Sequence, residues 1–235
     1  MLSIDAVILA GGLGTRLRAV LGDGPKPMAP IGDRPFLDVL IKDLVQQGLT
    51  RFILCVGYGR KRIIDYYRGR TDADFVFSEE ETPLGTGGAV RQAARYVRSN
   101  PFLVLNGDSF CSVDYAQFLA FHQDHDAALS IVVAGLHGRS DGGSIELGND
   151  RRITRFQEKA AVDGNGLVYI NAGVYLLQRE LPGAWQHSVP FSLEHDVFPA
   201  LIAHKPCYGF PIDSEVVDIG TPERYADAQG RLTGR

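Results

Sequence analysis

The stretch from Ala6 to Met28 constrains the fold of this chain more than any other. Its start, residues 4–10, is short, apolar and rich in β-branched side chains, and it stops at a run of glycines. That pattern predicts a buried parallel strand that ends in a loop. Because glycine has no side chain, a ligand can come close to the backbone amides of such a loop.

Cationic side chains follow these glycines. Arg16, Arg18 and Lys26 together with the backbone N–H groups would form a cradle for a polyanion, most simply a nucleoside triphosphate. The spacing is neither Gly-x-Gly-x-x-Gly nor that of a P-loop, so two common phosphate motifs are absent. Taken alone, the glycines also fit a simple turn after a strand, with both arginines on the surface.

The complete motif, glycines and flanking residues together, fits fewer protein families than the glycines alone. Leu-Ala-Gly-Gly-Leu-Gly-Thr-Arg-Leu occupies positions 9–17, and Pro-Lys-Pro-Met occupies positions 25–28. This pattern resembles the signature of the sugar-1-phosphate nucleotidyltransferases, which make nucleotide sugars from a nucleoside triphosphate and a sugar 1-phosphate. The resemblance extends over nearly the whole chain. It implies the nucleotide-diphospho-sugar transferase (glycosyltransferase-A-like) fold.

Composition narrows the class of protein. Of 235 residues, 45% are hydrophobic and 22% are charged, which is typical of a globular α/β protein. The net charge of −4 disfavours a general nucleic-acid binder. The three cysteines show no Cys-x-x-Cys spacing, which indicates free thiols in a reducing compartment. No apolar run approaches the ~20 residues of a membrane span. A cytoplasmic protein without a membrane or nucleic-acid partner is expected.

Strand and helix patterns alternate through the first half of the chain. This alternation predicts a Rossmann-like, mostly parallel mixed sheet flanked by helices, with ligands beyond the carboxyl ends of the strands. After Asp108 the strands become shorter, which predicts a mixed or antiparallel extension of the same sheet. We expect one domain over residues 1–235, with a nucleotide-binding part at about 1–110 and a sugar-phosphate-binding part at about 111–235. The expected strands are 4–10, 51–57, 75–78, 101–106, 127–135, 144–147, 153–158, 167–177, 208–212 and 215–219, and the expected helices are 35–48, 61–68, one through 90–97, 115–125, 194–203 and 222–228.

Two aspartates are candidate metal ligands. Asp108 follows an apolar strand, and Asp218 lies in Val-Val-Asp-Ile-Gly-Thr-Pro. A carboxylate at the end of a buried strand needs water, a partner or a cation, and Mg²⁺ prefers one or two carboxylates with phosphate oxygens. Either residue alone is as easily a helix cap. Asn-Gly-Asp and Asp-Ile-Gly-Thr-Pro are similar to the two metal-binding stretches of the family.

A second glycine cluster, Pro-Leu-Gly-Thr-Gly-Gly-Ala at 83–89, precedes a predicted helix. Its backbone groups could bind a base or a ribose, and Thr86 could cap the helix. Small residues needed for packing are the alternative. In the family this segment resembles the base-recognition loop. Glu80 lies just before it, and an acceptor facing N1–H and the 2-amino group would favour guanine.

A polar residue and a glycine interrupt the apolar strand at 167–177. Asn171 and Gly173 indicate either close approach of another group or a β-bulge. Glu158 and Lys159 lie at a strand edge, where a surface ion pair is the alternative. Both segments resemble the sugar-phosphate side of the family, with Glu158 and Asn171 toward hydroxyls and Lys159 toward the phosphate.

The resemblance thus implies a complete set of site residues, with Mg²⁺ as cofactor. Arg16, Lys26 and Asp108 would be catalytic, and Asp108 and Asp218 would hold the metal. Nucleotide binding would involve Leu9, Ala10, Gly11, Gly12, Gly14, Thr15, Glu80, Gly85, Thr86 and Asn106. Sugar-phosphate binding would involve Gly107, Glu158, Lys159, Asn171 and Gly173.

Within the family, residues 25–31, 34–37 and 80–89 are most similar to the D-glycero-D-manno-heptose 1-phosphate guanylyltransferases. The implied partners are GTP and that sugar 1-phosphate, and the implied product is a GDP-heptose for a bacterial surface polysaccharide such as capsule. Alternatives are a mannose-1-phosphate guanylyltransferase, a thymidylyltransferase for glucose 1-phosphate and a uridylyltransferase for an amino sugar. A regulatory module that binds nucleotide sugar without turnover is an alternative of another class. Relatives are commonly homodimers.

Overall fold

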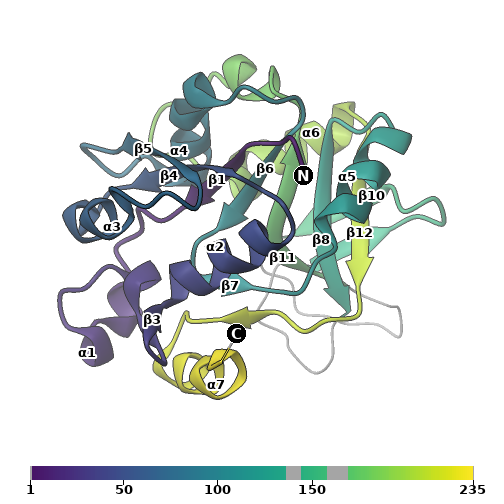
Figure 1. Cartoon of the computed structure of the whole chain (residues 1–235). Helices are drawn as coiled ribbons and strands as arrows, with labels where there is room; N and C mark the ends of the chain where they lie inside the picture. Colours follow the sequence, from purple (N-terminus) through teal and green to yellow (C-terminus); the bar gives the residue numbers. More distant parts are fainter. Residues whose placement is uncertain (1, 136–143, 158–168, 235) are drawn as a thin grey trace.

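The computed structural model describes residues 2–135, 144–157 and 169–234. Within them, nine strands form one mixed sheet in the order β10-β9-β11-β6-β1-β4-β5, with β8 beside β11 and β12 beside β8 (Figure 1). The strands are β1 (Ala6–Leu9), β4 (Arg51–Val56), β5 (Asp74–Glu79), β6 (Phe102–Asn106), β8 (Leu129–Gly135), β9 (Ser144–Leu147), β10 (Ile153–Gln157), β11 (Tyr169–Leu177) and β12 (Cys207–Ile212). The helices are α1 (Arg18–Leu21), α2 (Phe36–Gln46), α3 (Arg60–Tyr67), α4 (Gly85–Ala93), α5 (Tyr115–Asp124), α6 (Phe198–His204) and α7 (Pro222–Leu232). The expected α/β class with a mostly parallel mixed sheet is confirmed.

The centre of the sheet is parallel and buried on both faces. β1 pairs in parallel with β4 on one side and with β6 on the other, so that Val7 lies between Ile53 and Val104. Successive side chains of a strand point to opposite faces. Accordingly Ile8 belongs to the core beneath α2, α3, α5 and α7, and Val7 belongs to the core beneath α4 and α6. This double burial explains why the strand is an uninterrupted apolar run.

Strand β11 joins the two halves of the chain. Its second half pairs antiparallel with β6, and its first two residues pair with β9 on that same side. Its other edge pairs with β8, with a register shift between Asn171 and Tyr175. Gly173 has a φ of +76° within this shift. The bulge that the sequence offered as an alternative is therefore present, and it opens beside the carboxyl end of β6.

The expected strand at 215–219 differs from what the structure contains. Only Val217–Asp218 is extended, as β13, and it pairs antiparallel with another two-residue strand, β7 (Ser109–Phe110), outside the main sheet. β2 (Pro30–Ile31) and β3 (Arg34–Pro35) form a further small hairpin. Two-residue strands have no detectable alternation, so the sequence pattern could not separate β13 from the sheet.

The structure also explains the proline within the helix expected at 194–203. A π-helical turn, η5 (Leu193–Val197), precedes α6, and Pro199 falls in the first turn of α6. A proline in a first turn removes no hydrogen bond from the helix. The helix therefore begins anew at Phe198.

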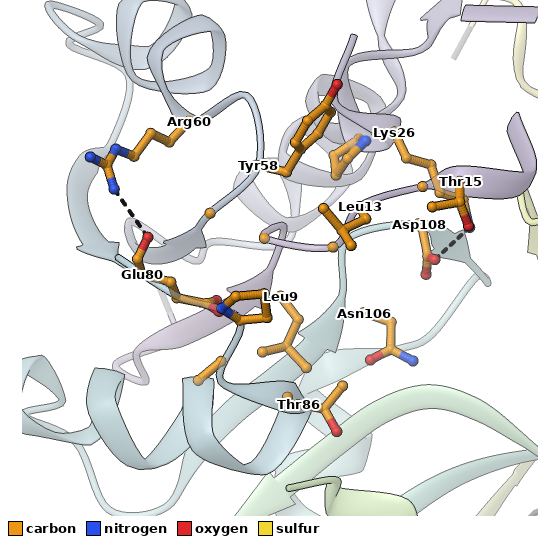
Figure 2. A pocket seen from close by; sticks show the side chains of 18 of the residues that line it. Leu9, Leu13, Thr15, Lys26, Tyr58, Arg60, Glu80, Thr86, Asn106 and Asp108 are labelled. Atoms are coloured by element: carbon orange, nitrogen blue, oxygen red, sulfur yellow. Dashed lines mark hydrogen bonds and ion pairs between the residues drawn. The ribbon is translucent and has the colours of Figure 1, made fainter. Parts of the chain in front are cut away.

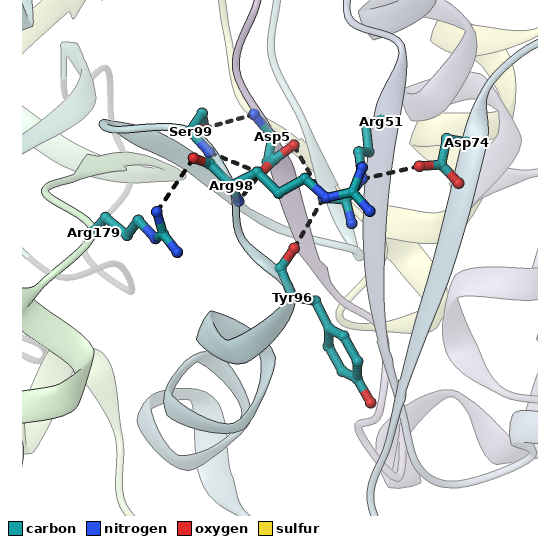
Figure 3. Close-up of polar contacts among 7 residues, drawn as sticks. All are labelled: Asp5, Arg51, Asp74, Tyr96, Arg98, Ser99 and Arg179. Atoms are coloured by element: carbon teal, nitrogen blue, oxygen red, sulfur yellow. Dashed lines mark hydrogen bonds and ion pairs between the residues drawn. The ribbon is translucent and has the colours of Figure 1, made fainter.

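The amino ends of the central strands are held by a charged network at the edge opposite the carboxyl ends (Figure 3). Asp5, which is 5% exposed, pairs with Arg51 at 3.1 Å and accepts hydrogen bonds from the backbone N–H groups of Arg98 and Ser99. Arg51 Nε also donates to Asp74 at 2.9 Å. These contacts link β1, β4, β5 and the segment before β6. They therefore hold the central strands in fixed positions relative to one another.

No helix among the described residues is long and apolar enough to cross a membrane.

Candidate active site

A large cavity of about 680 Å³ lies at the carboxyl ends of β1, β4 and β6. Figure 2 shows Glu80 toward one end of it and the Lys26–Asp108 pair toward the other. Most of the residues expected to bind the nucleotide line it together with the three expected catalytic residues, because ligand sites in such sheets lie at the carboxyl ends of the strands. These are Leu9, Gly11, Gly12, Gly14, Thr15, Arg16, Lys26, Glu80, Gly85, Thr86, Asn106 and Asp108.

Two of the expected residues lie behind this lining. Ala10 is 1% exposed, and its N–H donates to the Cys55 carbonyl at 2.9 Å. The Gly107 N–H donates to the Leu9 carbonyl at 2.9 Å. Neither residue lines the two cavities described here. Their observed contacts position the ends of β1 and β6.

Glu80 is a buried carboxyl group in the wall of this cavity. Its residue is 9% exposed, and its Oε2 accepts a hydrogen bond from the Leu84 N–H at 3.2 Å. Burial raises the pKa of Glu80, and the hydrogen bond from Leu84 opposes part of that rise. A Cβ at Gly11 would lie 2.6 Å from Glu80 Oε1, so the first glycine of the loop provides room for this carboxyl group. Glu80 therefore offers an acceptor at a desolvated position.

The Lys26 ammonium group lies at the other end of the cavity. Its Nζ is 2.6 Å from Asp108 Oδ2, and the lysine side chain is only 13% exposed. A Cβ at Gly14, which has a φ of +56°, would lie 2.8 Å from Lys26 Cβ. The glycine loop thus packs on the lysine stem and directs its charge toward Asp108.

The fold brings Asp108 and Asp218 to a second cavity. Pairing of β7 with β13 places Asp218 opposite Ser109, and the Ile219 N–H donates to the Asp108 carbonyl at 3.1 Å. Both aspartates line this cavity of about 210 Å³. The two cavities are adjacent because they share Arg16, Lys26, Asn106, Asp108 and Gly220.

This pair of carboxylates fits a divalent cation that is also bound by phosphates. Among the described residues there is no group of three or more His, Cys, Asp or Glu side chains that could hold a metal ion. Mg²⁺ needs only one or two carboxylates when phosphate oxygens and water complete its shell. Asp108 contacts Lys26, and Asp218 accepts from Arg224 Nη1 at 3.2 Å, so a cation here would compete with both side chains.

The second glycine cluster is explained first by packing. Phe191 lies against the start of α4, its carbonyl accepts from the Gly87 N–H at 3.0 Å, and a Cβ on Gly85 or Gly87 would collide with it. Thr86 does not cap the helix, because its hydroxyl donates to Glu194 and accepts from the Leu193 N–H, both at 2.8 Å. That prediction was wrong. Gly85 and Thr86 nevertheless line the large cavity.

Asn171 and Gly173 line the smaller cavity. A Cβ on Gly173 would lie 2.8 Å from Asn106 Nδ2 and 2.9 Å from Ser109 Oγ, so the close approach expected from the sequence is present. Asn171 already makes a hydrogen bond within its own strand, because its Oδ1 accepts from the Gly173 N–H at 2.9 Å. Glu158 and Lys159 lie outside the described residues.

Several lining residues were not anticipated from the sequence. Tyr58 and Arg60 line the large cavity just after β4, and Arg18 lies over the Tyr58 ring at 5.0 Å. The rule that sites follow the carboxyl ends of parallel strands could have identified both. Arg224 and Ser109 line the smaller cavity, but only the tertiary pairing of β7 with β13 reveals them.

The profile of the nucleotidyl transferase family matches residues 5–234. The chain therefore belongs to this family. A D-glycero-alpha-D-manno-heptose 1-phosphate guanylyltransferase from Aneurinibacillus thermoaerophilus is 35% identical, with 97% of this chain and 98% of that protein aligned. The Mycobacterium tuberculosis mannose-1-phosphate guanylyltransferase is 33% identical over 97% of this chain, which spans only 64% of that protein.

Solved structures agree with the family assignment. HddC from Yersinia pseudotuberculosis, in a crystal structure complexed with GMP-PN, superposes with a TM-score of 0.84. It is 35% identical in sequence and is covered over 99% of its length by 97% of this chain. The structural similarity therefore extends over nearly the whole length of both proteins.

Proposed function

We propose that this nucleotidyltransferase transfers GMP from GTP to D-glycero-α-D-manno-heptose 1-phosphate, with release of pyrophosphate and formation of GDP-heptose. The observation that carries the proposal is the junction of the two cavities at Arg16, Lys26 and Asp108. A nucleotide in the larger cavity and a sugar phosphate in the smaller one would meet there. Similarity over the full length of a heptose 1-phosphate guanylyltransferase supports the choice of sugar and base.

The reaction in this proposal is direct in-line transfer. A phosphate oxygen of the sugar 1-phosphate attacks the α-phosphorus of GTP, the bond to the bridging oxygen breaks, and pyrophosphate leaves. Because the attacking group is already an anion near neutral pH, no general base is required. Catalysis then consists of positioning and charge neutralisation.

Each charged residue has a role in that scheme. Arg16 would hold the β- and γ-phosphates, and Lys26 would neutralise the charge that develops at the α-phosphate. Asp108 and Asp218 would hold Mg²⁺, which supplies Lewis-acid stabilisation of phosphate charge when bound. Backbone amides of the loop at 11–15 would bind the triphosphate, and Asn171 and Gly173 would bind the sugar phosphate. Glu158 and Lys159 are proposed for the same sugar-phosphate side on the resemblance alone.

Glu80 is the proposed determinant for guanine. Among the five common bases, guanine presents two adjacent donors, N1–H and the 2-amino group, that match a carboxylate acceptor. The desolvated position of Glu80 in the cavity wall would strengthen these hydrogen bonds.

Mannose-1-phosphate guanylyltransferase activity is the second candidate, and it is supported by the partial-length relative. A module that binds nucleotide sugar without turnover is less well supported, because Arg16, Lys26, Asp108 and Asp218 are all present and line the two adjoining cavities. The same proposal includes one domain over residues 1–235, a homodimer, a cytoplasmic location and the supply of a surface polysaccharide. These points rest on the sequence and the resemblance.

Pyrophosphate release tests the proposal directly. The purified chain is assayed with Mg²⁺ and each of GTP, UTP, dTTP, CTP and ATP against three acceptors: heptose 1-phosphate, mannose 1-phosphate and glucose 1-phosphate. We expect the highest kcat/KM for GTP with heptose 1-phosphate. A higher value for mannose 1-phosphate would favour the second candidate, and absence of turnover with every pair would support the binding module.

A further inference from the structure

Glu194 lies outside the residues expected to bind substrate, but its carboxylate is the centre of a hydrogen-bond network. Oε2 accepts from the hydroxyls of Thr86 and Ser192, both at 2.8 Å. Oε1 accepts from the Tyr175 hydroxyl at 3.2 Å. These donors come from α4, from the residue just before η5 and from β11, so the carboxylate links η5 to two other elements of the fold.

The direction of each hydrogen bond in this network is determined. The Thr86 hydroxyl also accepts from the Leu193 N–H at 2.8 Å, and the Tyr175 hydroxyl also accepts from Asn171 Nδ2 at 2.8 Å. A hydroxyl has a single proton, and an ionised carboxylate can only accept. The protons of both hydroxyls are therefore directed at Glu194, and the Tyr175 oxygen faces the Asn171 amide as an acceptor.

The Asn171 amide is oriented from both sides as a result. Nδ2 donates to Tyr175, and Oδ1 accepts from the Gly173 N–H at 2.9 Å. Tyr175 is fully buried. Asn171 and Asn106 both line the smaller cavity, and Asn106 and Thr86 line the larger one. The network of Thr86, Glu194, Tyr175 and Asn171, here called the Glu194 network, thus reaches both cavities.

We propose that Glu194 is a positioning residue for the sugar 1-phosphate: through Tyr175 it sets which atoms of the Asn171 amide face the smaller cavity. The proposal rests on the proposed function, because it assigns the sugar phosphate to that cavity. It deepens that function by naming a residue that acts on the acceptor substrate without touching it.

The two arms of the network depend on Glu194 to different degrees. On the nucleotide side, the start of α4 is also held by backbone bonds with Phe191, which accepts from Gly87 at 3.0 Å and donates to the Leu84 carbonyl at 3.0 Å. On the sugar side, the Gly173 N–H holds Asn171 Oδ1, but Asn171 Nδ2 is held by the Tyr175 hydroxyl, whose proton Glu194 accepts. Loss of Glu194 should therefore disturb the sugar side more than the nucleotide side.

Steady-state kinetics of Glu194→Gln test this asymmetry. An amide nitrogen cannot accept, so at least one of the three hydroxyls must turn away. The fewest are displaced when the amide oxygen still faces Thr86 and Ser192 and the nitrogen faces Tyr175. We expect kcat/KM for the sugar 1-phosphate to fall about tenfold, the size of one lost charge-assisted hydrogen bond. The KM for GTP should stay within about threefold, because Phe191 still holds α4. Glu180→Gln, at an exposed carboxylate, is the matched control and should change neither value.

Tyr175→Phe provides an independent test if Glu194→Gln does not fold. It removes only the hydroxyl and keeps the ring, whose centroid lies 5.0 Å from that of Phe198. It should lower the same kcat/KM to a similar extent, and the double variant should be within about threefold of the worse single one, because both act through one network. Three outcomes would overturn the proposal. A folded single variant could show native-like kinetics, or kcat/KM could fall equally for both substrates. The loss in the double variant could also equal the product of the two single losses.

Failure of the proposed function is distinguished by binding. Calorimetry with heptose 1-phosphate and mannose 1-phosphate in the presence of a non-hydrolysable GTP analogue measures the acceptor site without turnover. If the native chain binds a sugar 1-phosphate but releases no pyrophosphate, only the proposed function fails, and weaker binding by Glu194→Gln still supports positioning. If the native chain binds neither sugar phosphate, both proposals are overturned.

Discussion

Lys26 Nζ and Asp108 Oδ2 lie 2.6 Å apart at the junction of the two cavities. The lysine begins the 3-10 turn η2 (Lys26–Met28), and the aspartate follows β6, 82 residues later in the chain. Their contact places one positive charge between the proposed nucleotide and sugar-phosphate sites. It is the relationship on which the proposed chemistry depends most.

Lys26→Gln should lower kcat by about 10²- to 10³-fold, the usual cost of losing one donor to transition-state charge. GTP should still bind, because the backbone amides of the glycine loop are unchanged. Single-turnover pyrophosphate release measures the loss, and Lys61→Gln, at a lysine 86% exposed and paired with Asp65, is the control. Turnover within about threefold of the native rate would contradict the role of Lys26.

Asp218→Asn should raise the Mg²⁺ concentration needed for half-maximal activity by about tenfold, because the cation would lose one of its two proposed carboxylate ligands. The amide oxygen can still accept from the Gly220 N–H, which contacts Asp218 Oδ1 at 2.8 Å. Mg²⁺ titration of the initial rate is the measurement. Asp33→Asn, at a side chain 87% exposed, should leave the titration curve unchanged. An unshifted curve for Asp218→Asn would remove that residue from the metal site.

Glu80→Gln should lower kcat/KM for GTP by about 10²-fold, because an amide nitrogen would face the donors of guanine.

The same change should stabilise the folded protein at pH 8. Burial raises the pKa of Glu80 in the folded state, so ionisation of the native residue favours unfolding as the pH rises above its ordinary value of 4.5. Thermal melting at pH 4 and pH 8 checks the sign, and the advantage of the variant should shrink at pH 4. A melting temperature below that of the native chain at pH 8 would contradict the cost assigned to burial.

Gly85→Ala should lower the free energy of unfolding by about 2–4 kcal/mol, because a side chain at φ +74° is strained and would meet the Phe191 backbone. Gly230→Ala, within α7 and with open space around its Cα, should instead be neutral or stabilising by up to about 1 kcal/mol. Urea unfolding measures both changes. If the two alanines had equal effects, packing of Phe191 on α4 would not be what requires Gly85.

Local patterns predicted the elements that carry most of the large cavity. The apolar run before Gly11 predicted β1, and helical spacing predicted the body of α4. The rule on strand ends then placed the glycine loop, Gly85 and Asp108 on one edge. Thr86 was assigned a cap because its partners, Leu193 and Glu194, lie more than a hundred residues away in the chain.

The sequence by itself determined the class of fold, the family and most of the residues that line the larger cavity, because strand period, glycine conformation and a contiguous motif are local properties. Only the tertiary structure decided that Asp218 lies opposite Ser109 and that Glu194 connects Thr86 with Tyr175. These contacts join residues far apart in the chain through two-residue strands and single hydroxyl groups. Such features have no periodicity that a sequence can display, and they form only when packing of the sheet brings their elements together.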